Sequence, residues 1–364
     1  MLAALAVAML VAATSGGVAK DLVEPGPSLR YQRPSGPLLV TLPSGDVLAI
    51  GGNLRFGHYT EAERLSLGGR HWKSAGTVPS KDVGWLADAA LLRDGRVLVI
   101  DVRGGSSLYD PARNLWRAGP PLTTVKGWAA LAALADGTAL ASGGCCVDGK
   151  ENALDVAEVY DPKLDRWTAV QPMHIGSVGH RLLALPDGRA LAVGGVMSKV
   201  QHPAFVGGAD VFDPRCGCWK AIGRSLPHNG NAITSVLMDG RVLFAGGQNA
   251  WNEPSTAAAI LDPKTDTVTP AQPLPLKCIG HTAALLPDAR VLVVCMDLLA
   301  RPNILTFQPD RGTWEVLGSP RRDLFGATLA ALPDGRALLV GGSGSKGTAA
   351  GVAIIDPRRG DRAK

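Results

Sequence analysis

The chain has 364 residues, of which 45 are Gly and 26 are Pro, a composition that suits many short strands and turns and disfavours long helices. Because 46% of the residues are hydrophobic and only 19% are charged, the chain can bury a large core, which excludes a disordered protein. The net charge of +5 is spread along the chain without a run of Lys and Arg, which excludes a nucleic-acid-binding arm, so we expect no nucleic-acid partner.

The N-terminal segment is the first recognisable element. Leu2–Ala13 is a nearly continuous apolar run, followed by small residues up to Ala19 and then by Lys20. The run is shorter than a membrane-spanning helix and is typical of a secretory signal, although no Lys or Arg precedes it. We expect residues 1–19 to be a signal peptide, residues 20–364 to form a single mature domain without a membrane span, and the protein to be secreted or periplasmic. The alternatives are a frayed apolar tail and a misassigned start codon.

A β-hairpin pattern recurs seven times after this segment. Its clearest copy is Leu182–Gly195, in which two apolar runs flank Pro186-Asp187-Gly188 and a double glycine ends the second run. Asp-Gly between apolar runs is typical of a tight hairpin turn, because Gly adopts positive φ without strain. The second turn residues of the seven copies are Gly45, Gly95, Gly137, Gly188, Gly240, Ala289 and Gly335. Their spacings of 50, 42, 51, 52, 49 and 46 residues predict the blades of a β-propeller.

Two further strands are predicted after each hairpin. The third strand ends at an Asp-Pro pair, as in Ala157–Pro162 and Ala209–Pro214, because Pro cannot donate to a strand ladder. In five copies a Trp opens the fourth strand, and one large ring per repeat is what the gap between two twisted sheets requires. We therefore expect these five residues to be structural: Trp72, Trp116, Trp167, Trp219 and Trp314.

With these features the chain resembles the kelch-repeat β-propellers, including the secreted bacterial proteins described as galactose-oxidase-like. The resemblance rests on the double glycines, the Tyr/Phe-Asp-Pro strands and the spaced Trp, and it covers nearly all of residues 20–364. Two copies depart from it, with Ile100-Asp101 and Cys295-Met296 in place of the glycine pair. The resemblance implies an all-β fold, a seven-bladed kelch-type propeller, which we expect to be monomeric; it implies little about function.

The end of the repeat indicates how the ring closes. The seventh copy stops soon after Asp356-Pro357, without a fourth strand, and Pro27–Arg33 precedes the first hairpin without a partner. We expect Pro27–Arg33 to supply the missing strand, so that the last blade combines three C-terminal strands with one N-terminal strand. Closure of this kind removes the exposed edges of an open sheet.

Binding residues are expected on the rim formed by the loops between second and third strands and the loops between blades. One position, after a Gly and just before the innermost strand, is occupied by Pro37, Trp85, Trp128, His180, Asn231, His281 and Ala327. Around a channel mouth, the Trp, His and Asn of this ring would offer stacking faces and neutral hydrogen-bonding groups to a sugar or a peptide. Trp251, which lies outside the strand pattern, is a further candidate contact residue. The alternative is that the ring residues only pack the corners between blades.

The six cysteines are read as disulfides, because their number is even and the chain is expected to be exported. Cys278 precedes an innermost strand and Cys295 ends the neighbouring one at the same end of the blade, so we predict a Cys278–Cys295 bond; two buried free thiols are the alternative. A vicinal Cys145–Cys146 bond is a second candidate. Ligation of a metal by Cys145, Cys146 and His174 is a weaker alternative, and we expect no metal.

Catalytic motifs are sparse. A copper-radical oxidase similar to galactose oxidase needs two Tyr and two His at the metal, and of the four Tyr only Tyr59 falls near the rim. We therefore expect neither this activity nor a cofactor. Two hypotheses remain: a binding propeller that recognises a glycan or a protein segment with its rim loops, which we favour, and a sugar-processing kelch enzyme resembling the sialic-acid epimerases.

The enzyme hypothesis requires Arg and acidic side chains in one pocket, whereas a binding module should lack a buried carboxylate or His with a strongly shifted pKa. The Arg and acidic residues available on the predicted rim are Arg55, Arg103, Arg224, Arg301, Arg321, Arg322, Asp82, Asp101, Glu151, Glu253, Asp297 and Asp323.

Overall fold

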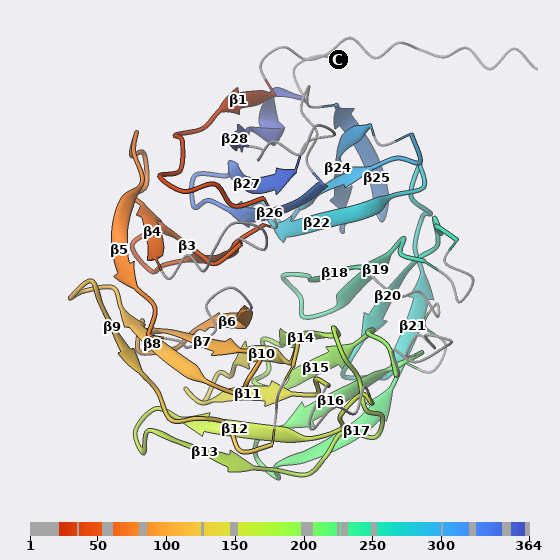
Figure 1. Ribbon diagram of the computed structural model, residues 1–364. Coiled ribbons are helices and arrows are strands. Elements are labelled where there is room, and N and C mark those ends of the chain that lie inside the picture. The colour runs from red at the N-terminus through yellow and green to blue at the C-terminus, as the bar shows by residue number, and fades with distance from the viewer. Residues whose placement is uncertain are drawn as a thin grey trace, which may run out of the picture.

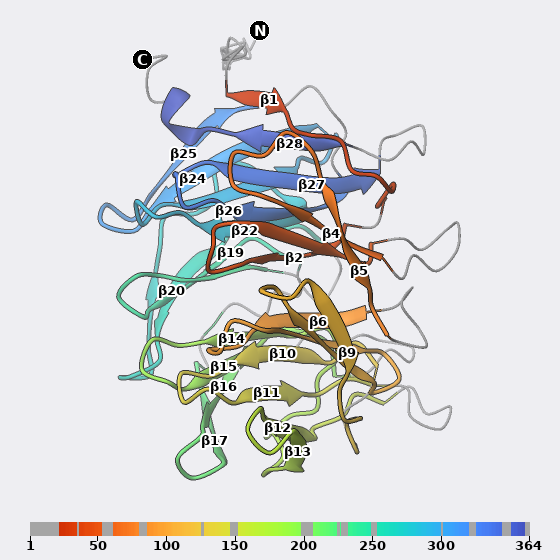
Figure 2. The same cartoon turned by 90° about the vertical axis from the view of Figure 1, so that its left-hand side faces the viewer.

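The computed structural model describes residues 22–34, 36–52, 61–79, 86–124, 127–145, 152–197, 207–223, 226, 232–248, 253–299, 301–319, 325–343 and 351–360. These residues form β-strands and one short 3-10 helix, η1 (Pro357–Arg359). The strands are arranged as seven four-stranded antiparallel sheets around a central channel, seen end-on in Figure 1 and from the side in Figure 2. None of the helical structure in these ranges is long and apolar enough to cross a membrane. The seven-bladed all-β propeller expected from the repeat is confirmed.

The first three blades follow one another in sequence. Blade 1 consists of β2 (Leu38–Thr41), β3 (Val47–Ile50), β4 (Glu61–Leu65) and β5 (Lys73–Thr77). Blade 2 consists of β6 (Leu86–Leu91), β7 (Val97–Asp101), β8 (Ser106–Asp110) and β9 (Leu115–Ala118). Blade 3 consists of β10 (Ala130–Ala133), β11 (Ala139–Ser142), β12 (Ala157–Asp161) and β13 (Arg166–Ala169).

The next three blades repeat this order, with the first strand of each nearest the channel. Blade 4 consists of β14 (Arg181–Ala184), β15 (Ala190–Val193), β16 (Ala209–Asp213) and β17 (Cys218–Ile222). Blade 5 consists of β18 (Ile233–Val236), β19 (Val242–Ala245), β20 (Ala258–Asp262) and β21 (Thr267–Pro270). Blade 6 consists of β22 (Ile279–Leu285), β23 (Val291–Met296), β24 (Pro302–Gln308) and β25 (Thr313–Gly318).

Blade 7 joins the two ends of the chain. Its C-terminal strands are β26 (Phe325–Ala331), β27 (Ala337–Ser343) and β28 (Val352–Ile355), and its outermost strand is the N-terminal β1 (Val23–Pro25). β1 pairs antiparallel with β28, with Val23 opposite Ile355. Pro25 is tolerated here because one edge of an outermost strand makes no ladder bonds.

The prediction that Pro27–Arg33 supplies the closing strand is therefore wrong, although closure by an N-terminal strand is confirmed. The segment instead runs from blade 7 towards blade 1, where the Pro27 carbonyl accepts a hydrogen bond from the Trp72 indole at 3.0 Å. Its last residue, Arg33, is fully buried and forms an ion pair with the equally buried Glu63 at 3.0 Å. A long-range ion pair thus fixes this stretch, which lies beside the next blade and not in a ladder.

The hairpin turns form as the sequence predicts. The six turn glycines have φ between 82° and 96°, a region where a side chain is strained, and Ala289 occupies the same position with φ of 70°. The strand after each of the first six turns (β3, β7, β11, β15, β19 and β23) is buried along its whole length. These strands read as continuous apolar runs because the neighbouring blades cover both of their faces.

The Trp residues connect neighbouring blades. The indole of Trp116 donates to the Ala75 carbonyl at 2.8 Å, and that of Trp219 donates to the Gln171 carbonyl at 2.8 Å; both carbonyls belong to the outer edge of the preceding blade. Trp72, Trp167 and Trp314 do the same to Pro27, Pro120 and Gln272. In four blades the Trp ring also packs 4.9–5.3 Å from a Tyr or Phe of the third strand. The structural role predicted for these Trp is confirmed.

The two ends of the propeller differ in their connections. We call one end the turn face, because the tight hairpin turns and the Asp-Pro turns lie there, and the other end the loop face, because the inter-blade loops and the loops between second and third strands lie there. On the turn face, Arg189 of blade 4 donates to the Pro263 carbonyl of blade 5 at 3.1 Å. Figure 1 looks onto the loop face.

Candidate functional site

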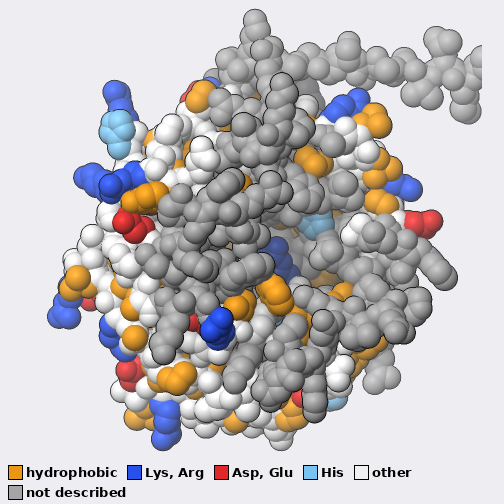
Figure 3. Space-filling model, viewed as in Figure 1, with side chains coloured by type: hydrophobic (Ala, Val, Ile, Leu, Met, Phe, Trp, Pro, Cys, Tyr) orange, Lys and Arg blue, Asp and Glu red, His pale blue; other side chains and the backbone are white. Residues whose placement is uncertain are grey.

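The central channel opens into a cavity of ≈ 620 Å³ on the loop face. Its wall includes residues from the innermost strands of six blades, namely β2, β6, β10, β14, β18 and β22. This volume lies within the range of ligand-binding pockets, about 300–1,000 Å³. Figure 3 shows a basic side chain in the hollow near the centre of this face.

Two charged residues of opposite sign line this cavity. Asp88 on β6 and Arg181 on β14 each lie seven residues before the turn residue of their hairpin, so they occupy the same level of two different blades. At that level the other blades carry Leu38, Ala130, Ile233, Thr282 and Thr328. The carboxylate and the guanidinium are therefore the charged groups of this ring.

Asp88 is held by backbone donors. Its two carboxylate oxygens accept hydrogen bonds from Ala89 N at 2.8 Å and from Leu131 N, on the innermost strand of the next blade, at 2.9 Å. Burial raises the pKa of the Asp88 carboxyl, while these two hydrogen bonds and the positive charge of Arg181 oppose the rise. The carboxyl thus lies at the channel wall in an environment that penalises its charge.

The Arg181 side chain makes no hydrogen bond or ion pair with any residue of the described ranges, and it is exposed and lines the cavity. Its charge reaches two groups across the channel: it opposes the rise in the pKa of Asp88 and adds to the lowering of the pKa of His281. The Arg of the next turn in the same blade differs, since Arg189 forms an ion pair with Asp187 at 2.7 Å. Arg181 therefore presents an available guanidinium to a molecule that enters the channel.

The seven ring positions read from the sequence do not lie at one level. The strand register places Pro37, His180, His281 and Ala327 eight residues before the turn, and Trp128 nine. The sequence reading counted from a preceding Gly, but the loops before the innermost strands differ in length. These positions therefore differ by one residue in level, while Trp128, His180 and His281 all line the cavity, and their role in binding stays a prediction.

The two histidines are neutral wall residues. His180 is 5% exposed, and its Nε2 lies 2.9 Å from the Ser142 hydroxyl of the preceding blade. Burial lowers the pKa of His180 to about 4. Burial also lowers the pKa of His281 to about 4, with a smaller contribution from Arg181. At neutral pH neither imidazole adds positive charge to the cavity.

Trp128 is the one predicted aromatic contact residue that the described ranges include. It lines the cavity and is 39% exposed, which leaves part of the indole face available for stacking. The loop before it is anchored by Glu158, whose buried carboxylate accepts hydrogen bonds from the backbone N–H groups of Thr123 and Thr124. Trp85, Asn231 and Trp251 lie outside the described residues.

The cavity continues outward from the channel over the ends of blades 4 and 5. This extension is lined by two double glycines, Gly194-Gly195 and Gly246-Gly247, and by Phe244. A methyl group added at Gly194 would meet no atom within 4 Å, so the glycine leaves open space and exposes backbone. The site therefore has the form of a groove that runs from the channel towards the periphery.

A smaller cavity of ≈ 240 Å³ adjoins the groove at blade 4. In its wall, His174 Nδ1 lies 3.0 Å from one oxygen of Asp210, and His174 N donates to the other oxygen at 2.9 Å. Asp210 has the same register on its third strand as Glu158 and Glu63 have on theirs, and all three fix the loop or segment that enters their blade. The His174–Asp210 pair therefore serves as a loop anchor.

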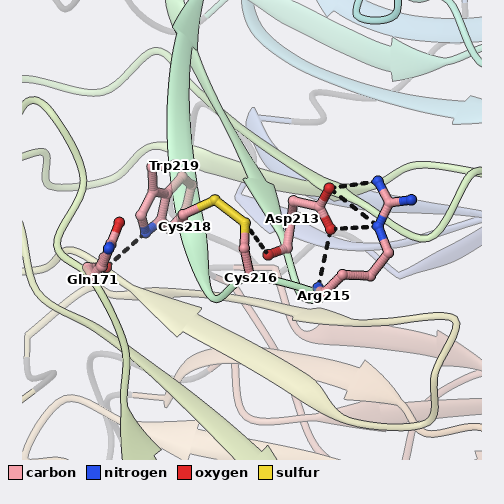
Figure 4. The surroundings of a disulfide bond; sticks show 6 residues. All are labelled: Gln171, Asp213, Arg215, Cys216, Cys218 and Trp219. Atoms are coloured by element: carbon pink, nitrogen blue, oxygen red, sulfur yellow. Dashed lines mark hydrogen bonds and ion pairs between the residues drawn. A yellow bond between two sulfur atoms is a disulfide. The ribbon is translucent and has the colours of Figure 1, made fainter.

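The cysteines of the described ranges are paired. Cys278 and Cys295 form a disulfide with a Cα–Cα distance of 5.5 Å, as the sequence predicts, and Cys278 lines the channel cavity. Cys145 is also disulfide-bonded, while Cys146 lies outside the described residues. The sequence reading did not pair Cys216 with Cys218, which form a third disulfide on the turn face (Figure 4).

Of the twelve residues named for a catalytic pocket, the five that the structure describes line neither of the two cavities. Arg301 pairs with Asp297 at the surface at 2.7 Å, and Asp101 accepts hydrogen bonds from Arg103 N and Gly105 N within one turn. Glu253 is exposed, and Arg55, Asp82, Glu151, Arg224, Arg321, Arg322 and Asp323 lie outside the described residues. The sequence reading missed Asp88 and Arg181, although a charged residue inside an apolar innermost strand was a visible signal.

Among the residues that the structure describes, Tyr and His side chains are not gathered as a copper-radical site requires. Tyr109 and Tyr160 are buried against Trp116 and Trp167 in the outer part of their blades. The Tyr31 hydroxyl donates to Glu61 at 2.6 Å, and Tyr59 lies outside the described residues. In the part of the chain that the structure describes, no three His, Cys, Asp or Glu side chains are grouped to hold a metal. The residues present there do not fit a copper centre.

Comparison with known proteins relates the chain to kelch proteins. The family model of the kelch motif matches residues 130–174, which is blade 3 and the loop that follows it. Kelch-like protein 15 of Danio rerio is 24% identical over 236 residues, 58% of this chain and 37% of that protein. Kelch-like protein 36 of Mus musculus is 27% identical over 199 residues, 52% of this chain and 31% of that protein. The chain thus aligns with only about a third of the length of these relatives.

A similar fold occurs in a solved structure of a fungal alcohol oxidase of the AA5 family in complex with copper. It superposes with a TM-score of 0.71 over 93% of this chain and 77% of the oxidase chain, at 15% sequence identity. At this identity the similarity concerns the fold alone. The kelch motif in blade 3, the kelch-like relatives and the seven four-stranded blades together support a kelch-repeat β-propeller.

Proposed function

We propose that this propeller is an interaction module that binds an extended segment of another protein on its loop face, with an acidic side chain of the segment directed into the channel towards Arg181. The observation that carries the proposal is the Arg181 guanidinium, exposed to the ≈ 620 Å³ cavity and without an ion pair in the described ranges. A carboxylate that pairs with it would bind inside the cavity, where a charge pair is less screened than on an open surface.

The form of the site supports a segment as the ligand. An extended chain needs a groove with accessible backbone, and the groove offers this at Gly194-Gly195, where both glycines are partly exposed. Trp128 at the channel mouth supplies a stacking face, and aromatic residues with Arg are the groups that most often dominate binding energy at interfaces. The match to the kelch motif is in keeping with an interaction role.

Panning a random peptide library on the purified full chain tests this proposal. We expect the enriched peptides to contain Asp or Glu and to bind at least about tenfold more weakly to Arg181→Ala, a loss that corresponds to about 1.4 kcal/mol. Arg113→Ala is the matched control, because Arg113 is an exposed Arg of the turn face, and it should bind like the wild type. Enriched peptides without acidic residues, or equal binding to both variants, would contradict the proposal. Enrichment of a glycan on an array, with no peptide bound, would favour the glycan hypothesis instead.

A second candidate function is a sugar-processing enzyme. It is favoured by one observation: Asp88, whose pKa is raised by burial, shares the channel cavity with Arg181, which is the convergence of acidic and basic groups that catalysis needs. In this reading the Asp88 carboxyl is a general acid or base. Incubation of the protein with a panel of reducing sugars and glycosides, followed by NMR, tests this candidate. Turnover of a sugar that Asp88→Asn lowers at least about a hundredfold would support the enzyme. No turnover of any sugar in the panel would favour the interaction module.

Export of the chain belongs to the same proposal. Residues 1–21 lie outside the described residues, so the signal peptide stays a prediction. The Cys216–Cys218 and Cys278–Cys295 disulfides support it, because such bonds persist in oxidising compartments. Mass spectrometry of the protein recovered from a periplasmic or culture fraction tests export. We expect a mass that lacks residues 1–19, and an intact N-terminus would contradict export.

A further inference from the structure

The Cys216–Cys218 disulfide lies in a turn that other blades form without one. In blades 2, 3, 4, 5 and 6 the third and fourth strands are joined by the same turn, and its last residue before the fourth strand has positive φ. These residues are Asn114 at 54°, Asp165 at 50°, Gly217 at 63°, Asp266 at 58° and Gly312 at 65°. The positions that correspond to Cys216 and Cys218 are Arg113 and Leu115 in blade 2, and Leu164 and Arg166 in blade 3. The turn therefore does not require the bond.

Other contacts already hold this turn in blade 4. Gly217 N donates to the Asp213 carbonyl at 3.0 Å, and the Asp213 carboxylate accepts from Arg215 N at 3.0 Å (Figure 4). Blade 3 uses the same side-chain contact without a disulfide, since Asp161 accepts from Lys163 N at 2.8 Å. The bond joins residues only two apart, so the loop that it closes is too short to constrain the unfolded chain strongly. The disulfide is therefore not needed to hold the turn.

The two fully described disulfides differ in access. Cys278 and Cys295 are 0% and 1% exposed, whereas Cys216 is exposed and Cys218 half-buried. An exposed disulfide is open to in-line attack by an external thiolate, and exposed bonds are the ones that exchange readily. The turn lies on the turn face, at the opposite end of the propeller from the channel mouth, so exchange there is independent of the binding site.

We propose that Cys216–Cys218 is a thiol–disulfide exchange site that oxidises a dithiol of a small molecule or a protein. A thiolate of the dithiol attacks Cys216 Sγ, the Cys216–Cys218 bond breaks, and Cys218 leaves as a thiolate that takes a proton from water. The second thiol of the dithiol then loses its proton and attacks the first dithiol sulfur, which is bonded to Cys216; the Cys216–dithiol bond breaks, and Cys216 leaves as a thiolate that takes up a proton. The dithiol loses two electrons and becomes a disulfide, and the two cysteines gain these electrons and become thiols.

Redox titration of the full chain tests this assignment. The protein is equilibrated in buffers of increasing reduced-to-oxidised glutathione ratio and alkylated, and each cysteine is mapped by mass spectrometry. We expect Cys216–Cys218 to be half reduced at a ratio [GSH]²/[GSSG] at least about a hundredfold lower than Cys278–Cys295, which serves as the internal control. Half reduction of both bonds at the same ratio would overturn the proposal.

Two variants separate exchange from a structural role. Cys218→Ser leaves Cys216 as a single thiol, which should form a mixed disulfide with oxidised glutathione that mass spectrometry detects as an added glutathione. The double variant Cys216→Ser with Cys218→Ser should melt within about 2 °C of the wild type, because the turn forms without the bond. A larger drop in Tm would identify the bond as a structural staple and overturn the proposal, as would a Cys216 thiol that stays unmodified.

Discussion

Two single residues, Ala289 and His180, have effects on stability that can be measured directly. The first concerns Ala289, the hairpin-turn residue that stands where the other six copies have Gly. Its φ of 70° places an L side chain in the left-handed region, which costs about 1–2 kcal/mol, whereas Gly adopts it freely at a smaller entropic cost. We expect Ala289→Gly to raise the free energy of unfolding by about 0.5–1 kcal/mol in chemical denaturation. Gly188→Ala, at φ of 92°, is the control and should lower it; a destabilised Ala289→Gly variant would contradict this account.

The second consequence concerns the pH dependence of stability. The folded pKa of His180, about 4, is below the unfolded value of about 6.5, so as the pH falls from 7.5 to 5 the unfolded chain takes up a proton that the folded chain does not. Stability is therefore lost on acidification in this window, by about 2 kcal/mol at pH 5 for this residue. In His180→Gln, which keeps a polar partner for Ser142, that part of the loss should disappear. An unchanged profile in His180→Gln would refute the assignment.

At the scale of elements, the blades are joined by side chains that reach from one sheet to the next. The Trp indoles bind the outer edge of the preceding blade, and Glu63, Glu158 and Asp210 each anchor the segment that enters their blade. These contacts lie 30 to 50 residues apart in sequence and recur at equivalent register. They position the inter-blade loops, and through them the groove.

The Arg33–Glu63 ion pair is the most deeply buried of these contacts, and its removal gives an element-scale prediction. Arg33 also donates to the carbonyls of Gly51 and Glu61, so Arg33→Ala leaves the buried Glu63 carboxylate without its positive partner and the two carbonyls without this donor. We expect a loss of about 3–5 kcal/mol in the free energy of unfolding. Arg113→Ala breaks a weak, exposed ion pair and should cost less than about 0.5 kcal/mol. A loss below about 1 kcal/mol for Arg33→Ala would mean that the pair is not buried as described.

At the scale of the whole molecule, closure of the ring depends on five residues at the N-terminus. Leu22 is buried in the core of blades 6 and 7, its carbonyl accepts from Asp356 N at 3.0 Å, and Gly26 N donates to the Val352 carbonyl at 2.8 Å. Deleting residues 22–26 would expose the edge of β28, so we expect aggregation or loss of a single cooperative melting transition in calorimetry and light scattering. A deletion variant as monomeric and as stable as the full chain would show that β1 does not close the ring.

The sequence predicts the propeller because its turn glycines, Asp-Pro pairs and Trp are local signals that repeat. It misplaces the closing strand because Val23-Glu24-Pro25 has no strand pattern of its own, whereas Pro27–Arg33 does; the partner of Arg33 is 30 residues away. The site is harder still to predict. Asp88 and Arg181 are 93 residues apart and line the same cavity only because two innermost strands face one channel, which the register shows and a local pattern does not.

The central claim is that Arg181 recognises a carboxylate at the channel mouth. A double-mutant cycle tests it most directly: an acidic peptide from the library and its Gln or Asn counterpart are each titrated against the wild type and Arg181→Ala. For a close charge pair we expect a coupling energy of at least about 1.5 kcal/mol, so that loss of the carboxylate weakens binding to the wild type but hardly changes binding to the variant. Additive losses, with a coupling near zero, would show that the two groups do not meet and would contradict the claim.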